Sequence, residues 1–165
     1  MKPSQKSQVL SQSPETNLTN LGIHLKKPPT PIGTFCNAKQ VGDLLFVSGQ
    51  GPVDERGTLR TGKVGDDVDL AAACAHARLV AINILATVKT FCGSLDHVDG
   101  VVKLMGLVNA TSDFTEHPKI IDEASRLMCD IFGPAGVHTR TSYGVGSLPN
   151  NITVEIDAIF ALRRD

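Results

Sequence analysis

The spacing of apolar residues divides the chain into strand-like and helix-like stretches. Residues 44–48, Leu-Leu-Phe-Val-Ser, form a short apolar run that a glycine closes on each side, as is typical of a buried strand. A weaker strand is expected over 35–41, and the Gly-Asp pair between the two runs favours a hairpin turn. The glycine-rich residues 51–66 predict a loop, with a short strand near 58–60.

Two later stretches change to the helical period. Apolar residues recur every three or four positions over 68–92, which predicts a long amphipathic helix. Acids at its start, Asp69 among them, suit an N-cap and the helix dipole, and Gly93 suits its end. A second helix is expected to begin at Pro118 and to end at Phe132, before a Gly-Pro pair.

The remaining apolar runs predict three more strands, over 101–110, 139–145 and 153–162. The last two are joined by the short loop Leu-Pro-Asn-Asn at 148–151, and we expect them to pair as a hairpin. The predicted order is β-β-(β)-α-β-α-β-β. This order indicates an α+β domain in which two helices pack on one face of a mixed sheet.

The N-terminal segment differs in composition from the rest of the chain. Residues 1–16 are rich in Ser and Gln and show no periodicity, so we predict a flexible N-terminal arm. Residues 17–165 are expected to form a single domain, because 165 residues are enough for one ordinary core.

Composition narrows the function classes. Formal net charge is −1 and aromatic residues make up only 4%, which weighs against a nucleic-acid binder with basic patches and stacking platforms. No uninterrupted apolar run has the length of a membrane span, and the N-terminus lacks a secretory pattern. The four cysteines form no CxxC pair and no zinc-ligand spacing, so we expect reduced thiols in a cytoplasmic protein without a metal or a cofactor.

The predicted sheet has more apolar surface than two helices can cover. Alternate residues of the last strand put Val154 and Phe160 on one face, whereas Ile159 and Ala161 put apolar surface on the other. A bare face of this kind would be a larger apolar patch than soluble monomers usually expose. We therefore expect other copies of the chain to cover it in a closed ring.

A few polar residues stand in unusual places. Glu155 and Asp157 alternate with apolar residues and share a sheet face, so each must be paired, hydrogen-bonded or functional. Arg140 opens the neighbouring strand and has two interpretations, an ion pair with an acid or a bidentate clamp for a ligand carboxylate. Ser48 and Gly49 end a strand and form either an ordinary turn or a cradle of N–H groups for a polar ligand.

Two separated motifs carry a family resemblance. The run from Gly42 to Pro52, GDLLFVSGQGP, resembles the G(N/D)xxxxSGQ(x)P segment of the Rid family, the YjgF-like reactive-intermediate deaminases that are also labelled endoribonuclease L-PSP. The run from Arg140 to Pro149, followed by VEIDA from Val154, is similar to the C-terminal signature R(S/T)xxxVxxLPxxxxVEIE(A) of the same family. The resemblance extends from about Pro31 to Leu162.

The resemblance implies a chorismate-mutase-like homotrimer with three pockets at the subunit seams. For the deaminase branch it implies cofactor-free hydrolysis of 2-imino acids, the tautomers of enamines, to 2-keto acids and ammonia. The catalytic pair would be Arg140, which binds the substrate carboxylate, and Glu155, which would hold a water and move its proton. Further substrate contacts would fall on Phe35, Ser48, Gly49, Ser142 and Asp122.

The chain also departs from the deaminase pattern. Phe35 stands where the deaminases have a tyrosine, so a pocket hydroxyl is missing. Gly144 stands where they commonly have a glutamate, and about four residues, 115–118, are extra. These departures indicate a side branch of the family.

Three functions therefore remain open. The first is the imine deaminase. The second is a non-catalytic trimeric module that binds small carboxylate metabolites or a protein partner, which the lost hydroxyl at Phe35 favours. The third is an endoribonuclease acting on single-stranded RNA, which the near-neutral charge and the few aromatic residues weigh against.

Overall fold

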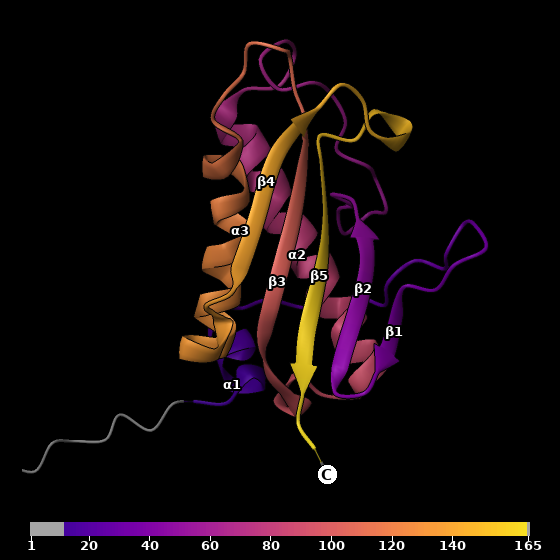
Figure 1. The fold of residues 1–165 in the computed structure, drawn as a ribbon, viewed down its shortest axis with the longest axis vertical. Coiled ribbons are helices and arrows are strands. Elements are labelled where there is room, and N and C mark those ends of the chain that lie inside the picture. The colour runs from indigo at the N-terminus through magenta and orange to yellow at the C-terminus, as the bar shows by residue number, and fades with distance from the viewer. Residues whose placement is uncertain (1–11, 165) are drawn as a thin grey trace, which may run out of the picture.

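The computed structural model describes residues 12–164, which form a five-stranded mixed sheet with two long helices on one face (Figure 1). The strands are β1 (Ala38–Val41), β2 (Leu44–Gln50), β3 (Val98–Asn109), β4 (Thr139–Val145) and β5 (Val154–Leu162). They lie in the order β1-β2-β5-β3-β4, so β1 and β4 are the edge strands. The expected α+β class and mixed sheet are confirmed.

The strand pairing corrects one prediction. β1 and β2 form the expected hairpin, with Val41 opposite Leu44 and a turn at Gly42, whose φ is +60°. β4 and β5, however, do not pair. β4 runs parallel to β3, and β5 lies between β2 and β3 and is antiparallel to both. The pairing of β4 with β3 follows from the helix between them, since a helix crossover returns the chain in the same direction beside its starting strand.

Helices α2 (Leu70–Cys92) and α3 (His117–Phe132) match the helical periods of the sequence. Asp69 caps α2, because its side chain accepts a hydrogen bond of 2.7 Å from the N–H of Ala72, and Gly93 ends the helix with a φ of +79°. α2 is long and apolar enough to cross a bilayer by length and composition alone, but half of the apolar window is buried inside the domain.

The core lies between these helices and the sheet. Every second residue of β5 faces it, and side chains of α2 and α3 fill the space opposite. The largest side chains that are fully buried include Phe160, Ile156, Leu45, Leu104, Ile84, Leu85, Ile121 and Leu127. The helix-facing side of the sheet is therefore closed by the chain itself.

A third helix, α1 (Pro14–Asn20), was not expected. Ser13 caps it, and its one buried apolar residue is Leu18. The amide of Asn17 donates a hydrogen bond of 2.9 Å to the carbonyl of Ile131 at the end of α3. The boundary drawn at residue 16 thus falls inside a helix packed on the domain, while residues 1–11 of the predicted arm lie outside the described residues.

Short elements complete the chain. Three 3-10 helices are η1 (Leu95–His97), η2 (Gly133–Gly136) and η3 (Pro149–Asn151). The strand expected near residues 58–60 is reduced to an isolated bridge between Val53 and Leu59. All four cysteines are free thiols.

The other side of the sheet, which we call the open face, has no helix over it (Figure 1). The second set of alternating residues points there, as the register of Phe46 with Ile159 and of Leu107 with Tyr143 requires. Phe46 is 42% exposed and Tyr143 40% exposed. Residues 12–164 therefore leave an apolar sheet surface uncovered, as the sequence predicted.

Candidate functional site

Arg140 lies near the start of the edge strand β4 and points toward α3. Its register opposite the buried Leu104 places it on the helix-facing side of the sheet. Nη1 of the guanidinium donates hydrogen bonds of 3.0 Å to Oδ1 of Asp122 and of 3.0 Å to Oγ of Ser125. Its side chain is 25% exposed. Among residues 12–164, neither Nε nor Nη2 has a hydrogen-bond partner, so one edge of the guanidinium stays available.

A hydrogen-bond chain behind Ser125 holds this arrangement. Nδ1 of His138 lies 2.6 Å from the carbonyl oxygen of Gly136, which can only accept, so Nδ1 carries the proton. Nε2 is then an acceptor, and it takes the hydroxyl hydrogen of Ser125 at 3.0 Å. The Ser125 oxygen in turn accepts from Arg140. His138 and Ser125 therefore fix the position of the guanidinium from the protein side.

Glu155 lies on β5 and points to the opposite side of the sheet, the open face. Its carboxylate packs directly on Gly49, where a Cβ atom would overlap Oε1. Burial raises the pKa of Glu155, and the neighbouring carboxylate of Asp157 raises it further. Among the described residues no side chain or N–H donates a hydrogen bond to it. A half-buried carboxylate whose pKa is raised holds a proton more readily than an exposed one, which suits it to take up and return protons.

Three of the sequence-predicted contacts surround a hollow beside Glu155. Phe35, Ser48 and Gly49 line a cavity of about 520 Å³ on the open face, together with Asp157. Ser48 uses its hydroxyl hydrogen for a bond of 2.7 Å to the carbonyl of Cys36. Phe35 is 53% exposed and contributes only a hydrocarbon ring. The ends of β1 and β2 thus place a mixed polar and apolar wall next to two acids.

The predicted site residues, together with their neighbours Ser125 and Asp157, consequently form two groups. One, the arginine edge, consists of Arg140, Asp122, Ser125 and Ser142, between β4 and α3. The other, the glutamate face, consists of Glu155, Asp157, Gly49, Ser48 and Phe35, on the open face. Because the two groups face opposite sides of one sheet, a single chain cannot bring the guanidinium and the Glu155 carboxylate to one substrate.

Asp122 and Ser142 belong to the arginine edge in different ways. Asp122, expected as a substrate contact, is the ion-pair partner of Arg140, and its second oxygen lies 3.1 Å from Nη2 of Arg126. The ion-pair interpretation of Arg140 is therefore confirmed, with the acid supplied by α3. Ser142 is half-buried opposite Gly106, two positions along β4 on the same side as Arg140.

Sequence reasoning missed Ser125 and the role of His138. Ser125 follows Asp122 by three residues on a helix, which puts both on one helix face, and this spacing was the available signal. His138 precedes Arg140 by two residues and lies just before the start of β4. In residues 12–164, no group of three or more His, Cys, Asp or Glu side chains is arranged to hold a metal ion.

Comparisons with known proteins agree with this architecture. A family model described as "YjgF/chorismate_mutase-like, putative endoribonuclease" matches residues 15–161. Protein TCP17 of Trypanosoma cruzi is 35% identical over 157 residues, which cover 94% of this chain and 98% of that protein. The 2-iminobutanoate/2-iminopropanoate deaminase of Salmonella typhimurium is 30% identical over 147 residues, which cover 86% of this chain and 97% of the deaminase.

A solved structure shows the same fold. A crystal structure from Shewanella oneidensis, also described as a "putative endoribonuclease", matches with a TM-score of 0.88 and 32% identity. The match covers 92% of this chain and 100% of that one. Together with the family model, which spans most of the described residues, these likenesses extend over both motifs and both long helices. The chain therefore belongs to the YjgF family, the Rid family whose two motifs it carries.

Proposed function

We propose that the protein catalyses the cofactor-free hydrolysis of small 2-imino acids to 2-keto acids and ammonia, at sites shared between copies of the chain in a closed homotrimer. The observation that carries this proposal is the half-used guanidinium of Arg140. Asp122 and Ser125 hold Nη1, while Nε and Nη2, a parallel pair of donors, have no partner among residues 12–164. The relationship to an imine deaminase of the same family supports the reaction class.

The free edge of Arg140 suits a carboxylate. Nε–H and one Nη2–H can each donate to one carboxylate oxygen, which is the strongest and most directional pairing that arginine makes. Since Nη1 is fixed by three linked residues, the guanidinium loses little freedom when the ligand binds. A 2-imino acid held in this way has its C=N carbon one bond from the clamped carboxylate, at a defined position.

Glu155 of a neighbouring copy would supply the proton transfers. Its carboxylate takes a proton from water as the water oxygen attacks the C=N carbon, which gives a carbinolamine. The protonated Glu155 then returns this proton to the nitrogen. Glu155 next takes the hydroxyl proton and passes it to the nitrogen, so that the C–N bond breaks, the C=O bond of the keto acid forms, and the nitrogen departs as ammonia. A raised pKa matches this alternation between base and acid.

The separation of the two groups supports an assembly in which neighbouring copies share each site, as in the proposed homotrimer. β4 is an edge strand, so its Arg140 can approach another copy, and the open face of that copy carries Glu155 amid exposed apolar side chains. Burying this face would cover the patch formed by Phe46, Tyr143 and Leu44. A cyclic arrangement would make each seam equivalent and would form three identical sites.

A second candidate is a non-catalytic module that binds small carboxylates. Phe35 favours it, because this ring lies in the hollow beside the acids and has no hydroxyl to donate to a substrate. The same clamp at Arg140 would then hold a carboxylate without turnover. Binding assays and turnover assays on one preparation separate the two functions.

The test is ammonia release from 2-iminopropanoate that is generated in the cuvette by an amino-acid oxidase. Arg140→Ala is expected to lower kcat/KM about a hundredfold, because two charge-assisted hydrogen bonds are lost. Arg164→Ala removes an exposed arginine outside the site and serves as the matched control, with unchanged rates. Equal turnover in Arg140→Ala and the wild type would contradict the clamp. Carboxylate binding without ammonia release in the wild type would support the binding module instead.

A further inference from the structure

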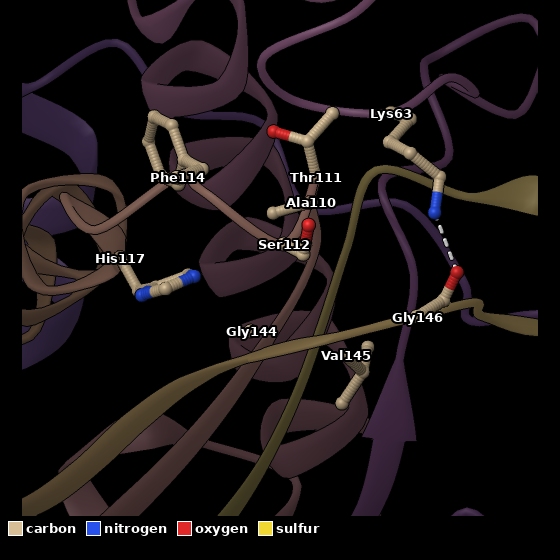
Figure 2. Close-up of a pocket in the computed structure, with 9 residues that line it drawn as sticks. All are labelled: Lys63, Ala110, Thr111, Ser112, Phe114, His117, Gly144, Val145 and Gly146. Atoms are coloured by element: carbon tan, nitrogen blue, oxygen red, sulfur yellow. Dashed lines mark hydrogen bonds between the residues drawn. The ribbon is translucent and has the colours of Figure 1, made fainter.

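A second pocket lies at the far end of β4 and has no role in the site described so far. Its volume is about 410 Å³, and it is lined by residues of three segments, the loop at Lys63, the stretch from Ala110 to His117, and Gly144–Gly146 of β4 and its following loop. Figure 2 shows the imidazole of His117 and the ammonium of Lys63 on opposite sides, with the hydroxyl groups of Thr111 and Ser112 between them. We call it the β4-end pocket.

The polar side chains of the β4-end pocket are one ammonium, one imidazole and two hydroxyl groups, of which that of Thr111 bonds the neighbouring Asp113. Nζ of Lys63 donates a hydrogen bond of 2.5 Å to the carbonyl of Gly146, which holds the ammonium at the rim and leaves its other hydrogens free. Within residues 12–164, neither ring nitrogen of His117 makes a hydrogen bond, and neither does the hydroxyl of Ser112. None of the described lining residues carries a carboxylate. A wall of this kind favours an anion.

His117 is held in place by the residues in which this chain departs from the deaminase pattern. Its ring contacts Phe114 edge to face, with centroids 5.2 Å apart. Its Nε2 packs on Gly144, where a Cβ atom would overlap it. Any side chain at 144, such as the glutamate of the deaminase pattern, would displace the ring. The extra residues 115–118, which include His117, and the glycine at 144 therefore act together: they place the His117 imidazole beside β4.

The pocket and the arginine edge lie on the same side of β4. Arg140, Ser142 and Gly144 alternate along β4 and face the same side, toward α3. On α3, His117 and the Arg140 partner Asp122 are five residues apart, which is about 7.5 Å along the helix axis. A ligand whose first carboxylate lies at Arg140 would extend toward His117 along this side of β4.

We propose that the β4-end pocket receives the distal carboxylate of a 2-imino dicarboxylic acid, with Lys63 and His117 as the residues that select it. The inference rests on the proposed deaminase function and names its substrate class. The carboxylate next to the imine would lie at Arg140, and two or three carbon atoms would connect it to the second carboxylate at Lys63 and His117. Imines with short apolar side chains would leave these donors without a partner.

The test compares three imines, each made in the cuvette by an amino-acid oxidase. The imines are 2-iminopropanoate, 2-iminosuccinate and 2-iminoglutarate. The measured quantity is the ratio of kcat/KM for a dicarboxylic imine to that for 2-iminopropanoate, which cancels any loss of folded protein. Lys63→Met keeps the length of the side chain without its charge, and His117→Phe keeps a planar ring without its nitrogens; each is expected to lower the ratio about tenfold. Lys119→Met removes an exposed cation next to His117 that does not line the pocket, and it should leave both values unchanged.

A binding experiment tests the pocket assignment separately from the proposed deaminase activity. Succinate and glutarate are titrated into the wild type while the NMR signals of the His117 ring are followed, and these signals should shift in the wild type but not in Lys63→Met. A wild type that hydrolyses 2-iminopropanoate with an equal or higher kcat/KM than both dicarboxylic imines overturns the pocket assignment and leaves the deaminase intact. Shifts at His117 in a protein that hydrolyses none of the three imines support the pocket and contradict the deaminase.

Discussion

A site shared between copies makes a quantitative prediction for mixed oligomers. Arg140→Ala and Glu155→Gln should each be inactive as pure proteins, because each lacks one half of every site. If equal amounts are mixed by unfolding and refolding together, a site functions only where a subunit with Arg140 is followed by one with Glu155. Random assembly of a ring gives this neighbour order at about a quarter of the sites. Two inactive proteins should thus recover about a quarter of the wild-type rate.

A second mixture distinguishes this architecture from a site within one chain. Wild type is mixed with an equal amount of the double variant Arg140→Ala, Glu155→Gln. For a shared site, both neighbours must be wild type, which again leaves about a quarter of the sites active. For a site within one chain, every wild-type subunit remains active, so about half of the rate persists, and the first mixture stays inactive.

The assay is ammonia release from 2-iminopropanoate, with size-exclusion chromatography to show that all mixtures assemble alike. Different affinity tags on the two parents allow hybrid rings to be isolated before measurement. An inactive first mixture together with a half-active second mixture would refute the reasoning, because the opposite orientation of Arg140 and Glu155 on the sheet would then have no consequence for the site. Glu155→Gln keeps the shape of the side chain next to Gly49, so the subunit seam should not change.

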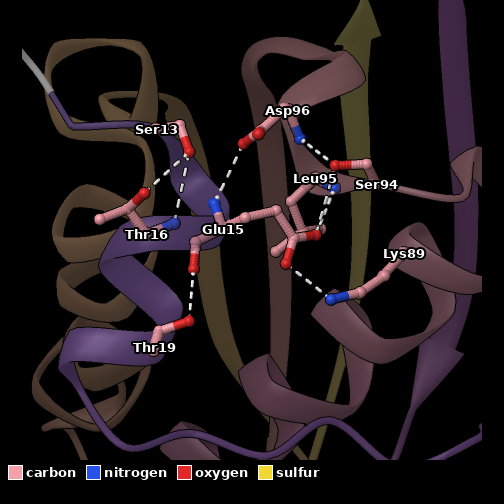
Figure 3. A network of polar contacts seen from close by, with 8 residues as sticks. All are labelled: Ser13, Glu15, Thr16, Thr19, Lys89, Ser94, Leu95 and Asp96. Carbon is pink, nitrogen blue, oxygen red and sulfur yellow. Dashed lines mark hydrogen bonds and ion pairs between the residues drawn. The ribbon is translucent and has the colours of Figure 1, made fainter.

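Two carboxylates predict opposite dependences of stability on pH. Glu15 of α1 accepts hydrogen bonds of 2.6 Å from Lys89 and 2.9 Å from the N–H of Leu95 (Figure 3). Burial raises the pKa of Glu15, but these bonds lower it by more, so that the pKa lies below the ordinary value of 4.5. Glu15→Ala should therefore cost about 1–3 kcal/mol in urea denaturation above that pH, and the difference from wild type should shrink as pH falls through the lowered pKa. The pKa of Glu155 is raised by burial and by Asp157, so its ionisation weakens the fold as pH rises above 4.5. Glu155→Gln should be more stable than wild type at pH 8 and equal to it below pH 4, and a constant difference at both pH values would contradict this assignment.

The sequence by itself determined the local elements. The period of apolar residues places α2 and α3 within two residues of their observed starts, and the Gly-Asp turn fixes the hairpin of β1 and β2, because these signals act between near neighbours. Helix α1 escaped prediction because its seven residues have one buried apolar side chain, and its order comes from contacts with Ile131, Lys89 and Leu95, which are distant in sequence.

Only the tertiary structure decided that the candidate site residues lie on two opposite sides of the sheet. The motifs predict functional roles for Arg140 and Glu155, but they say nothing about which side of the sheet each one faces. That outcome depends on strand order, since β4 pairs with β3 and β5 lies in the middle of the sheet, and one step of register reverses the facing of every residue. Likewise, the hydrogen-bond chain from His138 to Arg140 and the packing of His117 on Gly144 bring together residues of different elements. Such contacts arise only when the whole chain has folded, because nothing in the local sequence encodes the distance between two elements.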